Sequence, residues 1–100
     1  YMIPMKVTKI LRARFQTGRI VTSTLTEHAH YEGQIQVHTR PDDDMECNGY
    51  AMSTTWDDDL EHVLHAAMNQ LLMISNKTND QIESLKVFKN FSLDNYTKKR

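Results

Sequence analysis

The spacing of apolar residues changes near residue 57 from that of a strand to that of a helix. Downstream of this point the apolar residues recur at intervals of three and four, which is the pattern of one helix face. This stripe consists of Leu60, Val63, Leu64, Ala67, Met68, Leu71 and Leu72. We therefore expect an amphipathic helix from Trp56 or Asp57 to Ile74.

The residues at the expected start of this helix are suited to a helix N-terminus. Thr55 followed three residues later by Asp58 has the form of a capping box. The acidic run Asp57, Asp58 and Asp59 falls in the expected first turn, where carboxylates interact favourably with the helix dipole.

Upstream of the helix, the sequence predicts four strands. Residues 5–15 alternate, with Val7, Leu11, Ala13 and Phe15 on one side and Lys6, Thr8, Arg12 and Arg14 on the other. Lys9 and Ile10 break the alternation. Residues 16–19 contain Gly18 and predict a turn. The next strand is 20–26, with an extension through Tyr31 as an option. The third is 35–40, which Pro41 ends, and the fourth is 49–56.

Residues 82–93 fit two patterns. At helical spacing Ile82, Leu85 and Phe88 form a stripe, but Val87 and Phe91 fall outside it. Alternation accounts for more of the segment, so we favour a final strand over a second helix. The predicted fold is α+β, with a four- to five-stranded antiparallel sheet and one main amphipathic helix packed on one face. Residues 1–93 form a single domain, and 94–100 a polar, basic C-terminal tail.

The composition is that of an ordinary water-soluble domain. Apolar residues make up 39% and charged residues 25% of the chain, and no apolar run approaches the length of a membrane span. The opening residues 1–10 lack the basic region and apolar stretch of a secretory leader. A single cysteine, Cys47, forms no internal disulfide and favours a reducing compartment, so we expect a cytoplasmic protein without a membrane partner.

The charges are unevenly distributed along the chain. Residues 1–26 carry five basic and no acidic side chains, 27–61 carry ten acidic and one basic, and 62–100 carry six basic and three acidic. Such asymmetry bears on partners and association rather than on fold. The candidate acidic binding residues are Asp42, Asp43, Asp44, Glu46, Asp57, Asp58 and Asp59. The candidate basic binding residues are Lys6, Arg12, Arg14 and Arg19.

The segment 38–47, HTRPDDDMEC, concentrates metal-ligating residue types. A calcium loop requires oxygen ligands at alternating positions, a central glycine and a glutamate at the twelfth position. Here the aspartates are adjacent, the glycine is missing and Glu46 comes too early. A zinc site requires a second thiolate or histidines at short spacing, and Cys47 has none beside it. We therefore expect a solvated loop rather than a metal site.

The histidines offer a second metal hypothesis. His28 and His30 would share one face of a strand, and His38 would join them if residues 20–31 paired with 34–40. A polar, solvent-facing stripe is the favoured interpretation. On the helix, His62 lies four residues after Asp58 and His65 four after Glu61, which predicts exposed pairs.

Catalytic groupings are absent from the sequence. It contains neither a G-x-S-x-G motif nor a glycine-rich phosphate loop, and acidic neighbours disfavour a thiolate at Cys47. We therefore expect no enzyme and no cofactor, with a metal-dependent enzyme as the second alternative.

The predicted function is a small, non-catalytic interaction module, of the regulator or inhibitor type. It would bind another protein, or a second copy of itself in a dimer, through segregated acidic and basic surfaces. The first alternative is nucleic-acid binding by the basic N-terminal hairpin, whose arginines and threonines suit phosphate contacts but whose basic face lacks aromatic residues for base stacking.

Overall fold

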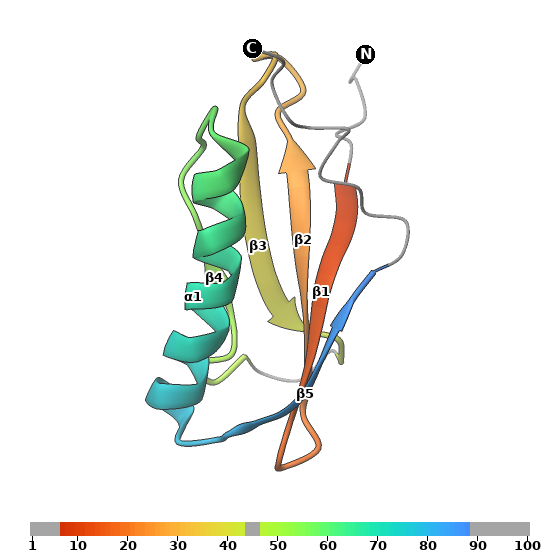
Figure 1. Cartoon of the computed structure of the whole chain (residues 1–100), viewed down its shortest axis with the longest axis vertical. Coiled ribbons are helices and arrows are strands. Elements are labelled where there is room, and N and C mark those ends of the chain that lie inside the picture. The colour runs from red at the N-terminus through yellow and green to blue at the C-terminus, as the bar shows by residue number, and fades with distance from the viewer. Residues whose placement is uncertain (1–6, 44–46, 89–100) are drawn as a thin grey trace.

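One antiparallel sheet and one helix make up the part of the chain that the computed structural model describes, which is residues 7–43 and 47–88 (Figure 1). The elements in chain order are β1 (Val7–Phe15), β2 (Ile20–Glu27), β3 (Ile35–Pro41), β4 (Met52–Ser53), α1 (Leu60–Thr78) and β5 (Ile82–Val87). The sheet order is β4-β3-β2-β1-β5, with every neighbouring pair antiparallel. The predicted α+β fold is confirmed, and β5 completes the sheet beside β1.

The strand β1 contains a β-bulge, and because of it the predicted assignment of side chains to the two faces is wrong before Leu11. The register with β2 pairs Lys9 with Thr24 and Leu11 with Ser23, so Ile10 is the extra residue. Ile10 is therefore buried on the same side as Leu11, against the helix. Upstream of the bulge the alternation is reversed, and Lys9 and Val7 are exposed rather than inward-facing.

The connection between β2 and β3 is a loop rather than an extension of the strand. The prediction that β2 continues through Tyr31 is wrong, because β2 ends at Glu27. The His28 N–H donates to the carbonyl of Gln34 at 2.8 Å, and the Gln34 N–H donates to the carbonyl of Tyr31 at 3.1 Å. Gly33, with φ +84°, supplies the left-handed conformation that this turn requires.

The helix α1 begins and ends later than the sequence pattern predicts. Its N-cap is Asp59, whose carboxylate accepts from the Glu61 N–H at 3.0 Å, so the predicted cap at Thr55 is wrong. Asp57 is held in extended conformation by two backbone hydrogen bonds to Ile35, which prevents an earlier start. The helix continues beyond Ile74 to Thr78 and ends at Asn79, which adopts the left-handed conformation of a C-cap.

The core lies between α1 and one face of the sheet, in two adjoining clusters. One cluster is built from Ile10, Leu25, Ile35, Val37, Leu60, Val63 and Ala67. The other is built from Ala13, Phe15, Val21, Tyr50, Leu71 and Ile74. A buried polar chain joins strand to helix: the hydroxyls of Ser23 and Thr39 are 2.6 Å apart, and Thr39 donates to the side-chain carbonyl of Gln70 at 2.7 Å.

The two outer strands differ from their predicted lengths. The fourth strand, predicted over 49–56, is reduced to Met52–Ser53. The final strand, predicted over 82–93, is present as Ile82–Val87, while residues 89–93 and the predicted tail 94–100 lie outside the described residues. Within the described ranges, no helix combines the length and apolarity that crossing a bilayer requires.

Candidate functional site

The face of the sheet opposite α1 is polar and basic, and no described element packs on it (Figure 1). Directly paired residues of neighbouring strands share a face. The register pairs Arg40 with Thr22, Thr22 with Arg12, and Arg12 with Lys86, so one row of these side chains crosses four strands. We call this surface the open face, and its cations are Lys9, Arg12, Arg14, Arg40 and Lys86.

A second row runs beside the first and adds hydrogen-bonding groups. It pairs Ser53 with His38, His38 with Thr24, and Thr24 with Lys9. The β-bulge is responsible for this position of Lys9, because without it Lys9 would face the core. Partial burial, together with the positive charge of Arg40, lowers the pKa of His38 below its ordinary value, which favours the neutral imidazole.

Asp42, which the sequence assigned to an acidic surface, lies instead on the basic open face. The Asp42 carboxylate is 3.2 Å from the Arg12 Nε and accepts a hydrogen bond from the Thr22 hydroxyl. Arg12 and Asp42 are each about one-third exposed, which makes this pair a partly buried contact within the protein. The two predicted charged surfaces are therefore not fully separate. Asp43 is exposed, and Asp44, Glu46 and Lys6 lie outside the described residues.

An aromatic side chain stands at the edge of the open face, next to two of its cations. The Phe88 ring centroid is 5.3 Å from the Arg12 guanidinium carbon and 5.3 Å from the Lys86 ammonium. The basic face of the hairpin itself has no aromatic residue, and Phe88 comes from a distant segment that the sheet order brings beside β1. Arg19, in contrast, lies at the β1–β2 turn with its guanidinium 4.6 Å above the Tyr50 ring.

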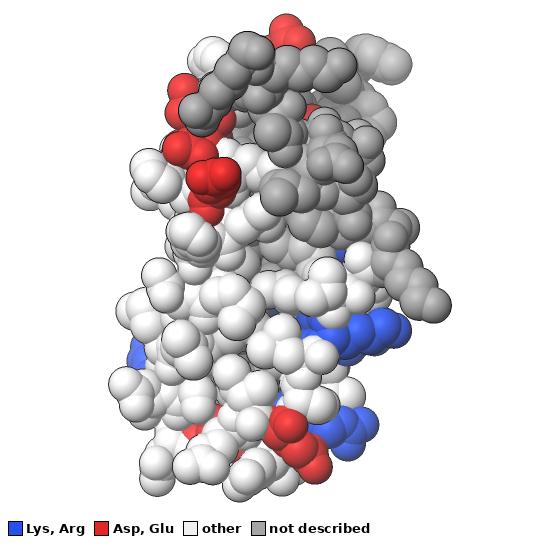
Figure 2. All heavy atoms as spheres, viewed as in Figure 1, with Lys and Arg blue, Asp and Glu red and all other residues white. Residues whose placement is uncertain are grey.

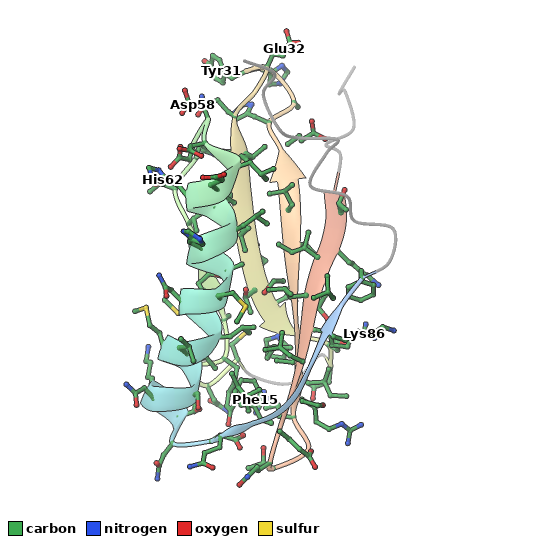
Figure 3. The ribbon with its side chains drawn as sticks, viewed as in Figure 1. Phe15, Tyr31, Glu32, Asp58, His62 and Lys86 are labelled. Atoms are coloured by element: carbon green, nitrogen blue, oxygen red, sulfur yellow. The ribbon has the colours of Figure 1, made fainter. Side chains whose placement is uncertain are left out.

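The opposite charge gathers where α1 begins. Figure 3 shows Glu32, Asp58 and His62 at the same end of the molecule. In Figure 2 acidic side chains cluster at this end, and basic side chains appear beside β1 and β5, with some acidic atoms next to them. We call this surface the acidic end, and its members are Glu32, Asp57, Asp58, Asp59 and Glu61.

Two carboxylates of the acidic end also have structural roles. Asp57 accepts from the Asp59 N–H at 2.9 Å, and Asp59 caps the helix. The hydrogen bond from the Asp59 N–H, with the nearby imidazole of His62, holds the pKa of Asp57 below its ordinary value. His62 Nδ1 lies 3.7 Å from an Asp57 oxygen and 3.8 Å from an Asp59 oxygen, so these residues replace the predicted partner Asp58.

The acidic end also carries an open pocket lined with aromatic rings. Its volume is about 550 Å³, and it is lined by His28, His30, Tyr31, Glu32, Gln34 and Trp56. The His28 ring centroid lies 4.7 Å from that of Tyr31 and 4.6 Å from that of Trp56. This pocket is not predictable from local sequence patterns, because Trp56 and the loop 28–34 are far apart in the chain.

The structure does not bring the three predicted metal-binding histidines together. His28 and His30 lie in the loop after β2, whereas His38 lies within β3 opposite Thr24. The condition for bringing them together, a pairing of 20–31 with 34–40, is met only as far as Glu27, which pairs with Ile35. Among residues 7–43 and 47–88, no group of three or more metal-ligating side chains is arranged to hold an ion.

The missed residues of the open face had only weak sequence signals. Arg40 alternates with His38 along β3, so its face follows once that strand is correctly placed. Lys86 and Phe88 required the pairing of β5 with β1, which local patterns do not specify.

Comparison of the chain with protein-family models, with curated protein sequences and with solved structures gives no match.

Proposed function

We propose that this chain is a non-catalytic interaction module that binds another protein through surfaces of opposite charge. The observation that carries the proposal is the line of cations across a sheet face on which no described element packs. An antiparallel sheet commonly covers one face with a helix and leaves the other to solvent. Here that second face carries Lys9, Arg14, Arg40 and Lys86 among hydroxyl groups. These four cations come from the three strands β1, β3 and β5.

The acidic end supplies the complementary surface. Its carboxylates lie at the start of α1 and in the loop after β2, whereas the cations of the open face lie on the sheet, so an incoming partner meets two surfaces of opposite net charge. Complementary fields of this kind accelerate encounter and fix orientation, and they discriminate against wrongly charged partners. Each exposed ion pair contributes only about 0–1 kcal/mol, so binding requires several of them acting together.

The proposal is tested by neutralising each surface separately and measuring the affinity for a partner isolated with the wild-type chain. For the open face the variant combines Lys9→Gln, Arg14→Gln and Lys86→Gln, which leaves the Arg12–Asp42 pair intact. We expect an affinity about tenfold weaker and a reduced dependence on salt.

The second variant combines Glu32→Gln, Asp58→Asn and Glu61→Gln, and it preserves the helix cap Asp59. It should weaken the same complex to a similar extent. Lys77→Gln is the matched control, because Lys77 is an exposed residue in the last turn of α1, and it should leave the affinity for the partner unchanged. Unaltered affinity in both combined variants would refute the proposal. Sedimentation of the wild-type chain alone shows whether the partner is a second copy.

Nucleic-acid binding is the second candidate, and the position of Phe88 favours it. A base can stack on an aromatic ring while nearby cations contact the phosphates, and this arrangement is common in single-strand binding. Phe88 lies between Arg12 and Lys86, which would serve these roles.

The two candidates differ in their response to Phe88→Leu and to salt. For a labelled single-stranded oligonucleotide, the logarithm of affinity should fall linearly with the logarithm of salt concentration, by roughly 0.7 for each phosphate contacted. The Phe88→Leu variant should bind less tightly with the same salt slope, and the open-face variant should have a shallower slope. An oligonucleotide that fails to bind at low salt would exclude this candidate and leave protein binding.

A further inference from the structure

The aromatic rings of the pocket at the acidic end are exposed, unlike the aromatic rings of the core. Phe15 and Tyr50 are buried in the core, whereas Tyr31 is 66% and Trp56 36% exposed. Large exposed aromatic side chains that gather in a pocket are typical of binding sites. Figure 3 shows Tyr31 beside Glu32 at the tip of the molecule, at the same end as Asp58.

Hydrogen bonds hold the wall of this pocket in place. The N–H groups of His30 and Tyr31 donate to His28 Nδ1 at 3.0 and 3.2 Å. Because backbone N–H groups only donate, His28 Nδ1 is the acceptor in both hydrogen bonds. The ring contacts to Tyr31 and Trp56 then connect the loop to the segment before α1. The pocket is thereby assembled before any ligand arrives.

The electrostatics of the pocket favour a cation. Glu32 is part of its wall, and Trp56 is followed directly by three aspartates. No lysine or arginine is among its lining residues. The faces of tryptophan and tyrosine rings attract cations through their quadrupoles, and this attraction adds to that of the carboxylate.

We propose that this pocket receives an arginine side chain of the partner protein. The inference rests on the proposed function and specifies which chemistry the partner presents to the acidic end. A guanidinium is planar, stacks on aromatic faces and donates several hydrogen bonds in its plane, which Glu32 and the Gln34 side-chain carbonyl can accept. A lysine ammonium is more strongly hydrated and has no plane to stack, so an open pocket of this form selects arginine.

Trp56 is the only tryptophan of the chain, so its fluorescence reports directly on the pocket. The experiment titrates the full chain with the peptide acetyl-Gly-Arg-Gly-amide. Matched peptides carry lysine or the neutral isostere citrulline in place of arginine. We expect a saturable change in Trp56 emission with arginine, and binding about tenfold weaker with citrulline, because citrulline lacks the charge. Equal binding of arginine and citrulline, or of arginine and lysine, would overturn the inference, as would the absence of saturation.

Two variants and one control locate the binding. Glu32→Gln removes the carboxylate of the wall, and Tyr31→Leu removes a ring that is 66% exposed. Each should weaken arginine binding severalfold, whereas Glu83→Gln, the same change at an exposed residue of β5 outside the lining, should bind as the wild type does. Wild-type affinity in both Glu32→Gln and Tyr31→Leu contradicts the assignment.

Failure of this inference is distinguishable from failure of the proposed function. If the peptides do not bind while the acidic-end variant still weakens the partner complex, the arginine pocket is wrong and the interaction module stands. If the arginine peptide binds while both combined variants leave the partner complex unchanged, the pocket stands and the proposed function is wrong.

Discussion

The two faces of the sheet are built from alternate residues of the same strands, yet one face is packed under α1 and the other is not. In β1, Ala13 and Phe15 are fully buried under α1, while Arg14 between them is exposed. In β3, Val37 and Thr39 are buried, and Arg40 is exposed. Side chains of the covered face are constrained by packing. Side chains of the open face pack against no described element, so packing constrains them less.

The largest effect that separates the two faces is expected from Phe15→Ala. The ring is 0% exposed and packs edge-on against Tyr50, with centroids 5.5 Å apart. Removing it leaves a cavity beneath the helix, so the free energy of unfolding should fall by about 3–5 kcal/mol in urea denaturation. The neighbouring change Arg14→Ala should alter it by less than about 0.5 kcal/mol. Similar losses in both variants would contradict the assignment of faces.

Two aspartates sharpen the comparison, because each accepts a hydrogen bond from a threonine in a different setting. Asp80 is 4% exposed and accepts from the Tyr50 hydroxyl at 2.8 Å and from the backbone N–H and the hydroxyl of Thr17. Asp42 is about one-third exposed and pairs with Arg12. Asp80→Ala should cost about 2–3 kcal/mol, because it leaves the buried Tyr50 hydroxyl and the two Thr17 donors without their acceptor, and Asp42→Ala about 0–1 kcal/mol. Thermal and urea unfolding of both variants measure this difference.

The same buried carboxylate predicts how stability responds to acid. Burial alone would raise the pKa of Asp80, but the hydrogen bonds from Thr17 and Tyr50 outweigh it and lower the pKa below its ordinary value. A carboxyl whose folded pKa is lowered stabilises the protein above its unfolded pKa of about 3.9, and this contribution is lost as the pH falls through the folded value. The variant Asp80→Asn should therefore show a flatter dependence of melting temperature on pH below about pH 4. An unchanged acid profile in this variant would mean that other carboxyls dominate.

The covered face was largely predictable from sequence, and each boundary that differs from the prediction has a physical cause. The apolar stripe of α1 and the alternation of β3 identify most of the core. The last helical turn, 75–78, carries no apolar residue, so periodicity could not detect it. The start of α1 was placed too early because Asp57 pairs with Ile35 across the chain, a long-range contact that local capping rules do not include.

The candidate site was harder to predict, because it depends on how the strands are aligned. Arg12 and Arg14 were identified from alternation, but Lys9 was assigned to the core side. The bulge places Ile10, which alternation assigns to the polar side, in the core. It also moves the side chains of the residues before it in β1 to the opposite face of the sheet. The aromatic pocket of the acidic end depends on a contact between Trp56 and the loop after β2, which no periodicity specifies.

A smaller effect is expected from His38, which lies on the open face but is partly buried. Its lowered pKa means that the unfolded chain takes up this proton at a higher pH than the folded one. Stability should therefore be complete above about pH 6.5 and decline by less than about 1 kcal/mol as the pH falls toward 5. His38→Gln should remove this decline, whereas the exposed His65→Gln on α1 serves as the matched control. A decline that persists in His38→Gln would assign it to other groups.

The smallest expected effect, a change near zero, tests the bulge itself. If Lys9 lies on the open face, Lys9→Gln should alter the free energy of unfolding by less than about 0.5 kcal/mol, since it removes no buried contact. Ile10→Gln places a polar group in the core at a position that is 1% exposed, and it should cost several times more. Simple alternation without a bulge predicts the reverse order, because Lys9 would face the core and Ile10 the solvent. Urea denaturation of the two single variants therefore decides between the two registers, and with them whether five cations or four share the open face.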